Sequence, residues 1–305
     1  LVEPRSNVVN THTHTHTHTR THTHTHTQNR YVNLDNTVLV AAMDMMLALE
    51  KRFGKEELAE HIDFIRQTIL NSLSFLKHSS KGCTLPTDEN GQVLLPGFQL
   101  KGALKPFLGF LQHGLQRSRD QRHAAAKMYG DLVSLTDKKS LKPFLIKITG
   151  PLIRGVGDRL QSNVKVAILH TLSLILDKGG AKLKPFLPQL QTTFVKGIHS
   201  DSEVVRSSAS NALSKLVKIT TRVDPLLKDL CTQISKVESA LLDDDPVSVS
   251  IRTELLNVLC VVLKCVGNKL KDKSVQLAVR SVRAWWCSSV EFVHSSIMNS
   301  FTHHQ

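Results

Sequence analysis

Aromatic residues and cysteines are scarce in this chain of 305 residues. Phe, Trp and Tyr make up 5% of it, whereas 41% of the residues are hydrophobic, with abundant Leu, Val, Ile and Ala. That combination favours helix-on-helix packing over a β-sandwich. The five cysteines are widely spaced and include no C-x-x-C pair, which argues against a disulfide framework and against a zinc module. We interpret them as buried, reduced thiols in apolar helical stretches.

Long hydrophobic runs and the motifs of common enzyme classes are also missing. No uninterrupted apolar run approaches the roughly 18 residues that cross a bilayer, and no signal-peptide pattern stands near the first residue. G-x-S-x-G, the P-loop and H-E-x-x-H do not occur. Gly155-Val156-Gly157 follows no strand, so we assign it to a helix end or bend. We therefore expect a cytoplasmic chain, truncated at its start, that is not an enzyme and uses no cofactor, metal or small-molecule substrate.

Positive charge outweighs negative charge. The chain has 39 Lys and Arg against 26 Asp and Glu, a formal net charge of +13. This balance favours an acidic partner, such as nucleic acid, the ribosome or an acidic protein face. A possible basic surface comprises Arg117, Arg119, Arg122, Lys138, Lys139 and Lys142, although such residues also occur on merely solvated helix faces. Aromatic residues do not interleave with them, which disfavours base stacking but leaves contact with phosphates open.

Residues 1–33 form a low-complexity head. Thr and His alternate over residues 11–27, interrupted by Arg20, and this stretch contains seven of the 16 histidines. Closely spaced imidazoles can chelate divalent transition metals. The stretch has no apolar residues, however, so it cannot offset the entropy lost on ordering. We predict a disordered extension. A strictly alternating Thr-His run is also what a dinucleotide repeat in the DNA encodes when it is read in one frame.

A five-residue phrase recurs through the middle of the chain. L-K-P-F-L occupies residues 104–108, 141–145 and 183–187, and V-D-P-L-L at 223–227 is a weaker copy. The spacing of its prolines is 37, 42 and 40 residues. A period of about 40 residues is that of HEAT and armadillo arrays, in which each repeat is a helical hairpin. Because proline is tolerated in the first helical turn, each phrase predicts the start of a first helix.

Apolar residues recur at helical spacing within every unit. We therefore predict an all-α fold, a HEAT/armadillo-type α-solenoid of about five helix pairs. Its predicted parts after the head are a HEAT-like hairpin at 34–78, a loop or linker at 79–99, four HEAT repeats at 100–267 and an atypical C-terminal tail at 268–305. Each second helix is expected to follow a short acidic turn, as at Asp201, with a capping Asp or Ser and an Arg, such as Arg206, that ladders along neighbouring turns.

Three strings go beyond a generic HEAT pattern. They are LPGF at 95–98, ITGPLIR at 148–154 with Gly157-Asp158-Arg159, and LKPFLPQLQTTFVK at 183–196. From about residue 35 to 240 the chain resembles, in order, the C-terminal third of the general-control-nonderepressible translational activator, a very large eukaryotic HEAT protein. The Thr/His head and the tail do not resemble that family.

The resemblance implies a function and a partner. Such a protein sits on stalled or colliding ribosomes, where it recruits and activates the amino-acid-starvation kinase that phosphorylates the alpha subunit of translation initiation factor two. Family members contact the RWD domain of that kinase through HEAT repeats of this portion, and the motif position indicates Arg154 or Arg159 as protein-binding residues. The residues alone leave a second hypothesis open: a transport- or chromosome-type HEAT scaffold that binds a peptide or nucleic acid.

Overall fold

The computed structural model describes residues 41, 44–79, 85–157, 160–221, 223–240, 246–266 and 270–283. The Thr/His head, Arg159 and residues 284–305 of the predicted tail lie outside this set. Within the described ranges, the one extended pairing is an isolated antiparallel bridge between Thr87 and Val93. All other regular structure there is helical, so the predicted all-α class is confirmed.

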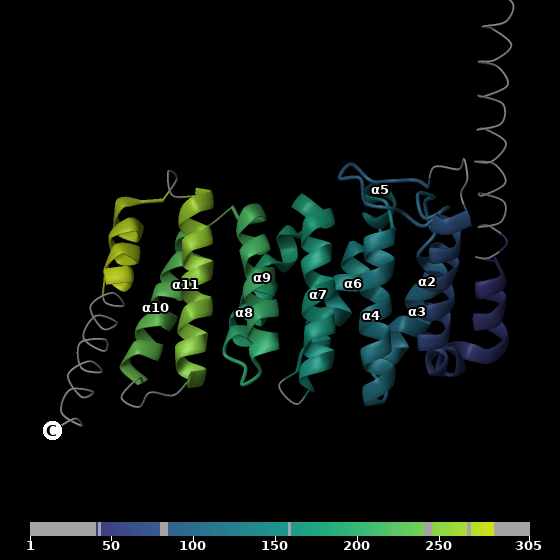
Figure 1. Cartoon of the computed structure of the whole chain (residues 1–305), viewed down its shortest axis with the longest axis horizontal. Helices are drawn as coiled ribbons and strands as arrows, with labels where there is room; N and C mark the ends of the chain where they lie inside the picture. Colours follow the sequence, from purple (N-terminus) through teal and green to yellow (C-terminus); the bar gives the residue numbers. More distant parts are fainter. Residues whose placement is uncertain are drawn as a thin grey trace, which may run out of the picture.

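The helices follow one another as a row of pairs (Figure 1). Helical residues 44–60 and α2 (Ile62–Ser79) form unit 1. Units 2 to 5 are α3 (Lys105–Gly114) with α4 (Arg119–Leu135), α6 (Leu145–Gly155) with α7 (Ser162–Gly179), α8 (Leu187–Ile198) with α9 (Glu203–Ile219), and α10 (Val223–Ala240) with α11 (Pro246–Val266). The short α5 (Lys138–Leu141) and the 3₁₀ helix η1 (Gly180–Phe186) connect units, and helical residues 272–283 follow α11. This is the predicted solenoid of about five pairs.

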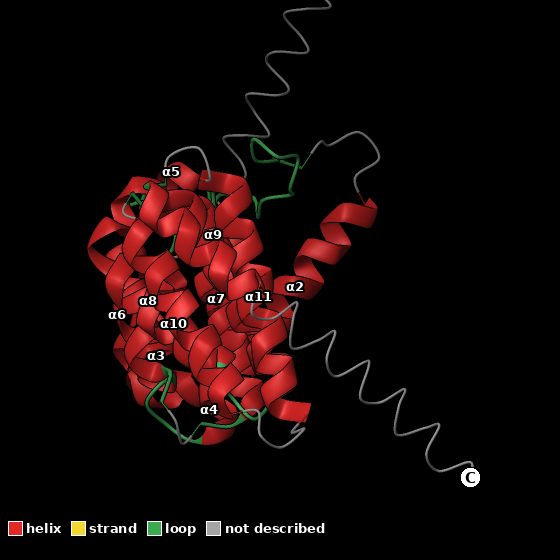
Figure 2. Cartoon of the chain, turned by 90° about the vertical axis from the view of Figure 1, so that its left-hand side faces the viewer, coloured by secondary structure: helices red, strands yellow, loops and turns green. Residues whose placement is uncertain are grey.

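The two helices of each unit lie in different layers. The second helices α2, α4, α7, α9 and α11 pack closely, each against the next. The first helices α3, α6, α8 and α10 pack mainly against their own second helices and barely touch one another. Seen along the row in Figure 2, the first helices lie to the left of the second helices. The tighter layer is therefore that of the second helices, and the looser layer leaves grooves between first helices.

The repeated phrase marks the start of the first helix in all four copies, but its proline lies in the first helical turn in only two of them. Pro106 and Pro225 lie in the first turns of α3 and α10, as predicted. Pro143 and Pro185 are not in a first helical turn, because they lie in a turn and in η1, just before α6 and α8 begin at Leu145 and Leu187. What the three L-K-P-F-L copies share is a first leucine that is at most 1% exposed: Leu104, Leu141 and Leu183. The phrase therefore anchors the turn between units through apolar burial, and the helix starts where the local backbone allows it.

One hydrophobic core runs through the stack from Leu58 to Ala278. Each unit shares its buried residues with its neighbours, because a single helical pair cannot cover its own apolar face. The segment after the unit 1 hairpin joins this core through Phe98, which is 2% exposed, and through the partly buried Leu95. The Phe98 ring lies 5.9 Å from the Phe107 ring, centroid to centroid. The described part of the predicted loop therefore packs onto unit 2.

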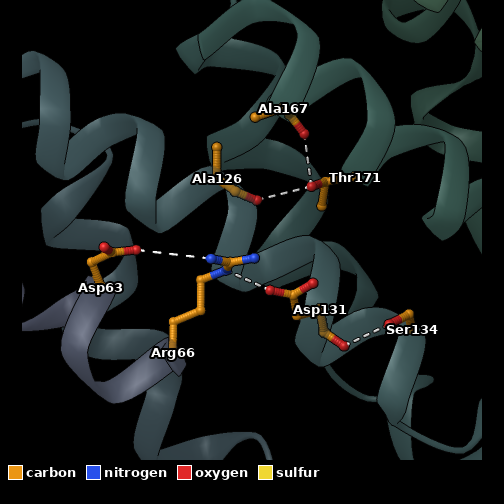
Figure 3. Close-up of polar contacts among 7 residues, drawn as sticks. All are labelled: Asp63, Arg66, Ala126, Asp131, Ser134, Ala167 and Thr171. Carbon is orange, nitrogen blue, oxygen red and sulfur yellow. Dashed lines mark hydrogen bonds and ion pairs between the residues drawn. The ribbon is translucent and has the colours of Figure 1, made fainter. Parts of the chain in front are cut away.

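Polar contacts also join consecutive second helices (Figure 3). Arg66 of α2 donates from Nε to Oδ2 of Asp131 on α4, at 2.6 Å. Thr171 of α7 donates from Oγ1 to the Ala126 carbonyl of α4, at 3.0 Å. A Cβ added at Gly130 would come within 3.0 Å of that same hydroxyl oxygen, so glycine permits the close approach of α4 and α7. These contacts fix the positions of α2, α4 and α7 relative to one another.

A buried arginine joins unit 4 to unit 5. Arg206, near the start of α9, is 4% exposed. Its Nη1 donates to the carbonyls of Ser200 and Asp201, each at 2.8 Å, and its Nε and Nη2 donate to Ser250 Oγ of α11, at 3.0 and 2.8 Å. The expected side-chain cap at Ser202 makes no hydrogen bond. The turn before α9 is thus held by Arg206 rather than by a capping side chain.

The last unit contains an unusually apolar helix. By length and composition, Pro246–Cys265 of α11 is the one described segment that could cross a membrane. Its buried residues Leu255, Val258, Leu259 and Val262 contribute to the core, where α11 packs against α9 and α10. We therefore describe it as a solenoid helix.

The described cysteines are only partly buried. Cys231 of α10 is buried, and burial raises the pKa of its thiol. Cys260 and Cys265 are exposed on α11, so the expectation of buried thiols is wrong for these two. The sequence offered no means to tell which side of α11 would face solvent, because apolar residues occupy most of that helix.

Candidate interaction surface

The structure divides the predicted basic residues between the two ends of α4. Three of them lie at its beginning, beside the turn from α3: Arg117, Arg119 and Arg122. The other three lie beyond its end, on α5 and just after it (Figure 1): Lys138, Lys139 and Lys142. A helix of 17 residues is about 25 Å long, which exceeds the screening length of about 8 Å at physiological salt. The six residues therefore do not form one basic surface.

Arg154 comes together with Arg122 instead. Both line a groove of about 450 Å³ between units 2 and 3, here called the Arg122–Arg154 groove. Its other lining residues are Gln112, Leu115 and Gln116 at the end of α3, and Pro151, Gly155, Gly157 and Leu160 in and after α6. None of these described residues is a carboxylate. Arg159 lies outside the described residues, so the structure places only the first member of the predicted pair Arg154 and Arg159.

The ITGPLIR string positions Arg154 on the surface. Ile148 and Leu152 turn into the core, each at most 1% exposed, while Arg154 is exposed in the last turn of α6. A Cβ added at Gly150 would lie 3.4 Å from Nη1 of Arg154, so the guanidinium folds back over the glycine one turn earlier. A cation at the end of a helix also interacts favourably with the helix dipole. The string thus combines an apolar inner face with a guanidinium at the rim of the groove.

Arg122 lies deeper than Arg154. It is half-buried in the first turns of α4. Its Nη2 donates to the Arg117 carbonyl at 3.1 Å. Its Nε is buried and has no hydrogen-bond partner among the described residues. Most buried polar groups in proteins are hydrogen-bonded, so this unpaired guanidinium nitrogen is an exception.

Arg117 is directed away from this groove. Its Nε donates to Nε2 of His113 at 2.7 Å, and its Nη2 lies 3.1 Å from Oε2 of Glu56 in unit 1. Arg117 is therefore partly neutralised by a local ion pair. Arg119, by contrast, is exposed at the same end of α4 and does not line the groove.

A second groove lies between units 3 and 4. Its volume is about 680 Å³, and it meets the Arg122–Arg154 groove at Gly157, which lines both. The α8 part of its wall consists chiefly of Gln189, Thr192, Thr193 and Lys196, spaced to share one face of the helix. The LPQLQTTFVK part of the third string thus has two faces, because Leu190, Phe194 and Val195 are buried. Sequence reasoning missed this polar face, although its spacing within the string was visible.

His199 also lines this second groove. Burial lowers the pKa of His199 below its ordinary value, opposed by Asp229 and reinforced by Lys236. Within the described residues no group of three or more His, Cys, Asp or Glu could hold a metal ion. The described linings of both grooves carry cationic and amide hydrogen-bond donors, and the lining of the second groove also includes Asp201.

The fold and these surfaces define a HEAT-type helical-repeat protein with grooves between its units. No protein-family model matches the chain, and no solved structure matches it. Curated relatives do match. Protein ILITYHIA of Arabidopsis thaliana is 37% identical over 247 residues, 81% of this chain. The stalled ribosome sensor GCN1 of Homo sapiens is 41% identical over 202 residues, 66% of this chain.

A third relative is the eIF-2-alpha kinase activator GCN1 of Saccharomyces cerevisiae, 37% identical over 190 residues, 62% of this chain. The resemblance read from the strings is confirmed, and over the matched part the chain belongs to the GCN1 family. The chain spans 8% of the length of the Arabidopsis relative and 7% of the length of the human and yeast relatives.

Proposed function

We propose that this chain is a non-enzymatic scaffold in translational control, acting in the cytoplasm in the response to amino-acid starvation. The observation that carries this proposal is the 41% identity to a relative named as a stalled ribosome sensor. A second relative is named as an activator of the eIF-2-alpha kinase. An open helical stack whose surface grooves carry hydrogen-bond donors suits the binding of another macromolecule better than the enclosure of a small substrate.

The proposed direct partner is the RWD domain of the starvation-response kinase. Arg154 lies in the last turn of α6 and is exposed at a groove rim, and Arg159 follows it in the sequence. A guanidinium at such a rim suits a carboxylate of an acidic protein face. The net charge of +13 adds a general attraction for acidic partners, the ribosome among them.

Binding of the full chain to the purified RWD domain, at low and at moderate salt, tests this proposal. We expect saturable binding that weakens as salt rises, because salt screens exposed charges. The double variant Arg154→Ala with Arg159→Ala should lose most of the binding. The matched control, Lys138→Ala with Lys139→Ala, removes the same charge at the other end of α4 and should bind like the wild type.

Two outcomes would contradict the proposal at different levels. If the arginine double variant binds as well as the wild type, the site is elsewhere on the chain. If the wild-type chain is helical and melts cooperatively but does not bind the domain, the RWD domain is not its partner.

A further inference from the structure

The strongest unexplained feature of the surface is the guanidinium of Arg122. Its Nε is buried without a hydrogen-bond partner in the described part of the chain, while one Nη nitrogen is fixed to the Arg117 carbonyl at 3.1 Å. Leaving a buried donor unpaired is unfavourable, because it loses its hydrogen bonds to water without replacement. Arg122 also lines the Arg122–Arg154 groove, so an acceptor placed in the groove lies beside this guanidinium.

The position of Arg122 is set before any ligand arrives. The Arg117 carbonyl that holds it belongs to a residue whose own side chain is fixed by His113 and Glu56. The start of α4 is fixed as well, since the Ser118 amide donates to Oε1 of Gln121 at 3.3 Å. A preorganised guanidinium loses less conformational entropy on binding than a free one, so each hydrogen bond contributes more.

The lining of the groove selects for a carboxylate on a protein. Its described residues include two guanidinium groups, Arg122 and Arg154, and the amides of Gln112 and Gln116, but no acidic side chain. Arginine binds a carboxylate through two parallel hydrogen bonds. Binding of single-stranded nucleic acid instead uses aromatic stacking platforms along a basic track, and the described lining of this groove contains no aromatic residue.

We propose that the Arg122–Arg154 groove binds an Asp or Glu side chain of an acidic protein segment, with Arg122 as its specificity-determining residue. Arg122 pairs with the carboxylate at the floor of the groove through its guanidinium group. Arg154 contacts it from the rim, and the two Gln amides donate to the backbone or side chains beside it. This assignment deepens the proposed function and rests on it where the RWD domain is taken as the protein that supplies the carboxylate.

Three variants of the full chain separate this geometry from general electrostatics. Arg122→Gln removes the charge, Arg122→Lys keeps the charge but loses the planar fork, and Arg119→Gln removes an exposed charge from the same end of α4. Each is titrated against an oligoglutamate peptide, the purified RWD domain and a short single-stranded RNA. Circular dichroism confirms that each variant is folded.

We expect both Arg122 variants to weaken binding of the peptide and of the RWD domain by roughly tenfold or more, because paired guanidinium–carboxylate bonds are lost. Arg119→Gln should change affinity by less than about twofold, as exposed charges usually do. If Arg122→Lys binds like the wild type, or Arg119→Gln weakens binding as much as Arg122→Gln does, the carboxylate site is refuted. Binding of RNA that depends on Arg122, without binding of the peptide, also refutes it.

The two proposals fail separately. If the RWD domain does not bind but the peptide binds in a manner that depends on Arg122, the groove assignment stands and the proposed partner is wrong. If the RWD domain binds, and loses binding with Arg154→Ala but not with either Arg122 variant, the proposed function stands and the role of Arg122 is wrong.

Discussion

Replacement of Arg206 by alanine should loosen the contact between units 4 and 5 without unfolding the rest of the stack. The side chain is 4% exposed and makes four hydrogen bonds, two to the turn carbonyls of Ser200 and Asp201 and two to Ser250 Oγ. Alanine removes all four and leaves a space between α9 and α11. The acceptors left behind are then partly unpaired.

The expected loss is about 2–4 kcal/mol. A hydrogen bond from a charged donor contributes about 1.5–3 kcal/mol. The sum for four independent bonds would therefore be well above the loss that we expect. Two effects reduce it. Asp201 is exposed, so water can reach the turn and replace part of the lost hydrogen bonding. The two bonds to Ser250 share one hydroxyl acceptor, so they do not contribute independently.

Hydrogen exchange of the backbone amides measures this loss unit by unit. Because each unit of a solenoid is stabilised by its nearest neighbours, a weakened interface should let α10 and α11 open together. A loss of 2–4 kcal/mol corresponds to roughly 30- to 700-fold faster exchange in those helices, with a much smaller change in α4 and α7. The matched control is Arg119→Ala, an exposed arginine whose removal should leave exchange unchanged.

Exchange in α10 and α11 that stays within about threefold of the wild type would refute the energetic role of Arg206. Equal acceleration in every helix would refute the nearest-neighbour reasoning instead. Ser250→Ala completes a double-mutant cycle with Arg206→Ala. The stability lost with Ser250→Ala should be smaller, and it should not add to the loss caused by Arg206→Ala, because both variants remove the same two bonds.

Three further predictions concern single residues. Lys178→Met should lower the free energy of unfolding by about 1–3 kcal/mol, seen as a lower urea midpoint, because its ammonium donates to two carbonyls at the end of α4, at 2.6 and 2.9 Å. Gly197→Ala should destabilise by about 1–3 kcal/mol, since the new Cβ would lie 2.7 Å from the Ala209 Cβ. Gly157→Ala, which meets nothing within 4 Å, should change the melting temperature little. Burial is the main cause that lowers the pKa of His123 in the folded chain below its ordinary value of 6.5. The unfolded chain therefore binds this proton at a higher pH than the folded chain does. The free energy of unfolding should then fall as the pH drops from 6.5 through the pKa of the folded state. A His123→Gln variant should show a flatter pH dependence of unfolding in that window.

The family resemblance and the solenoid could be read from particular local patterns. The L-K-P-F-L phrase at about 40-residue intervals and the apolar residues at helical spacing report on single hairpins. Hairpin periodicity is a property of nearby residues, so the number of helix pairs followed directly. The three family strings were equally local, and the comparisons confirm the resemblance they carried.

The exact role of the phrase, in contrast, depended on packing. Leu104, Leu141 and Leu183 are all buried, yet Pro106 lies inside its helix whereas Pro143 and Pro185 precede theirs. The same holds for Arg206. Its motif position suggested a helix start, but only the neighbouring α11 supplies the Ser250 hydroxyl that completes its bonding.

The amino-acid sequence by itself determined the all-α class, the repeat period, the family and the presence of excess positive charge. Only the tertiary structure decided which charges act together. It separated Arg122 from the lysines after α4, and it brought Arg122 and Arg154 to one groove although they lie in different repeats. The reason is that a groove between units exists only once two hairpins have stacked, and the stacking is set by the shared core rather than by the residues that line the groove.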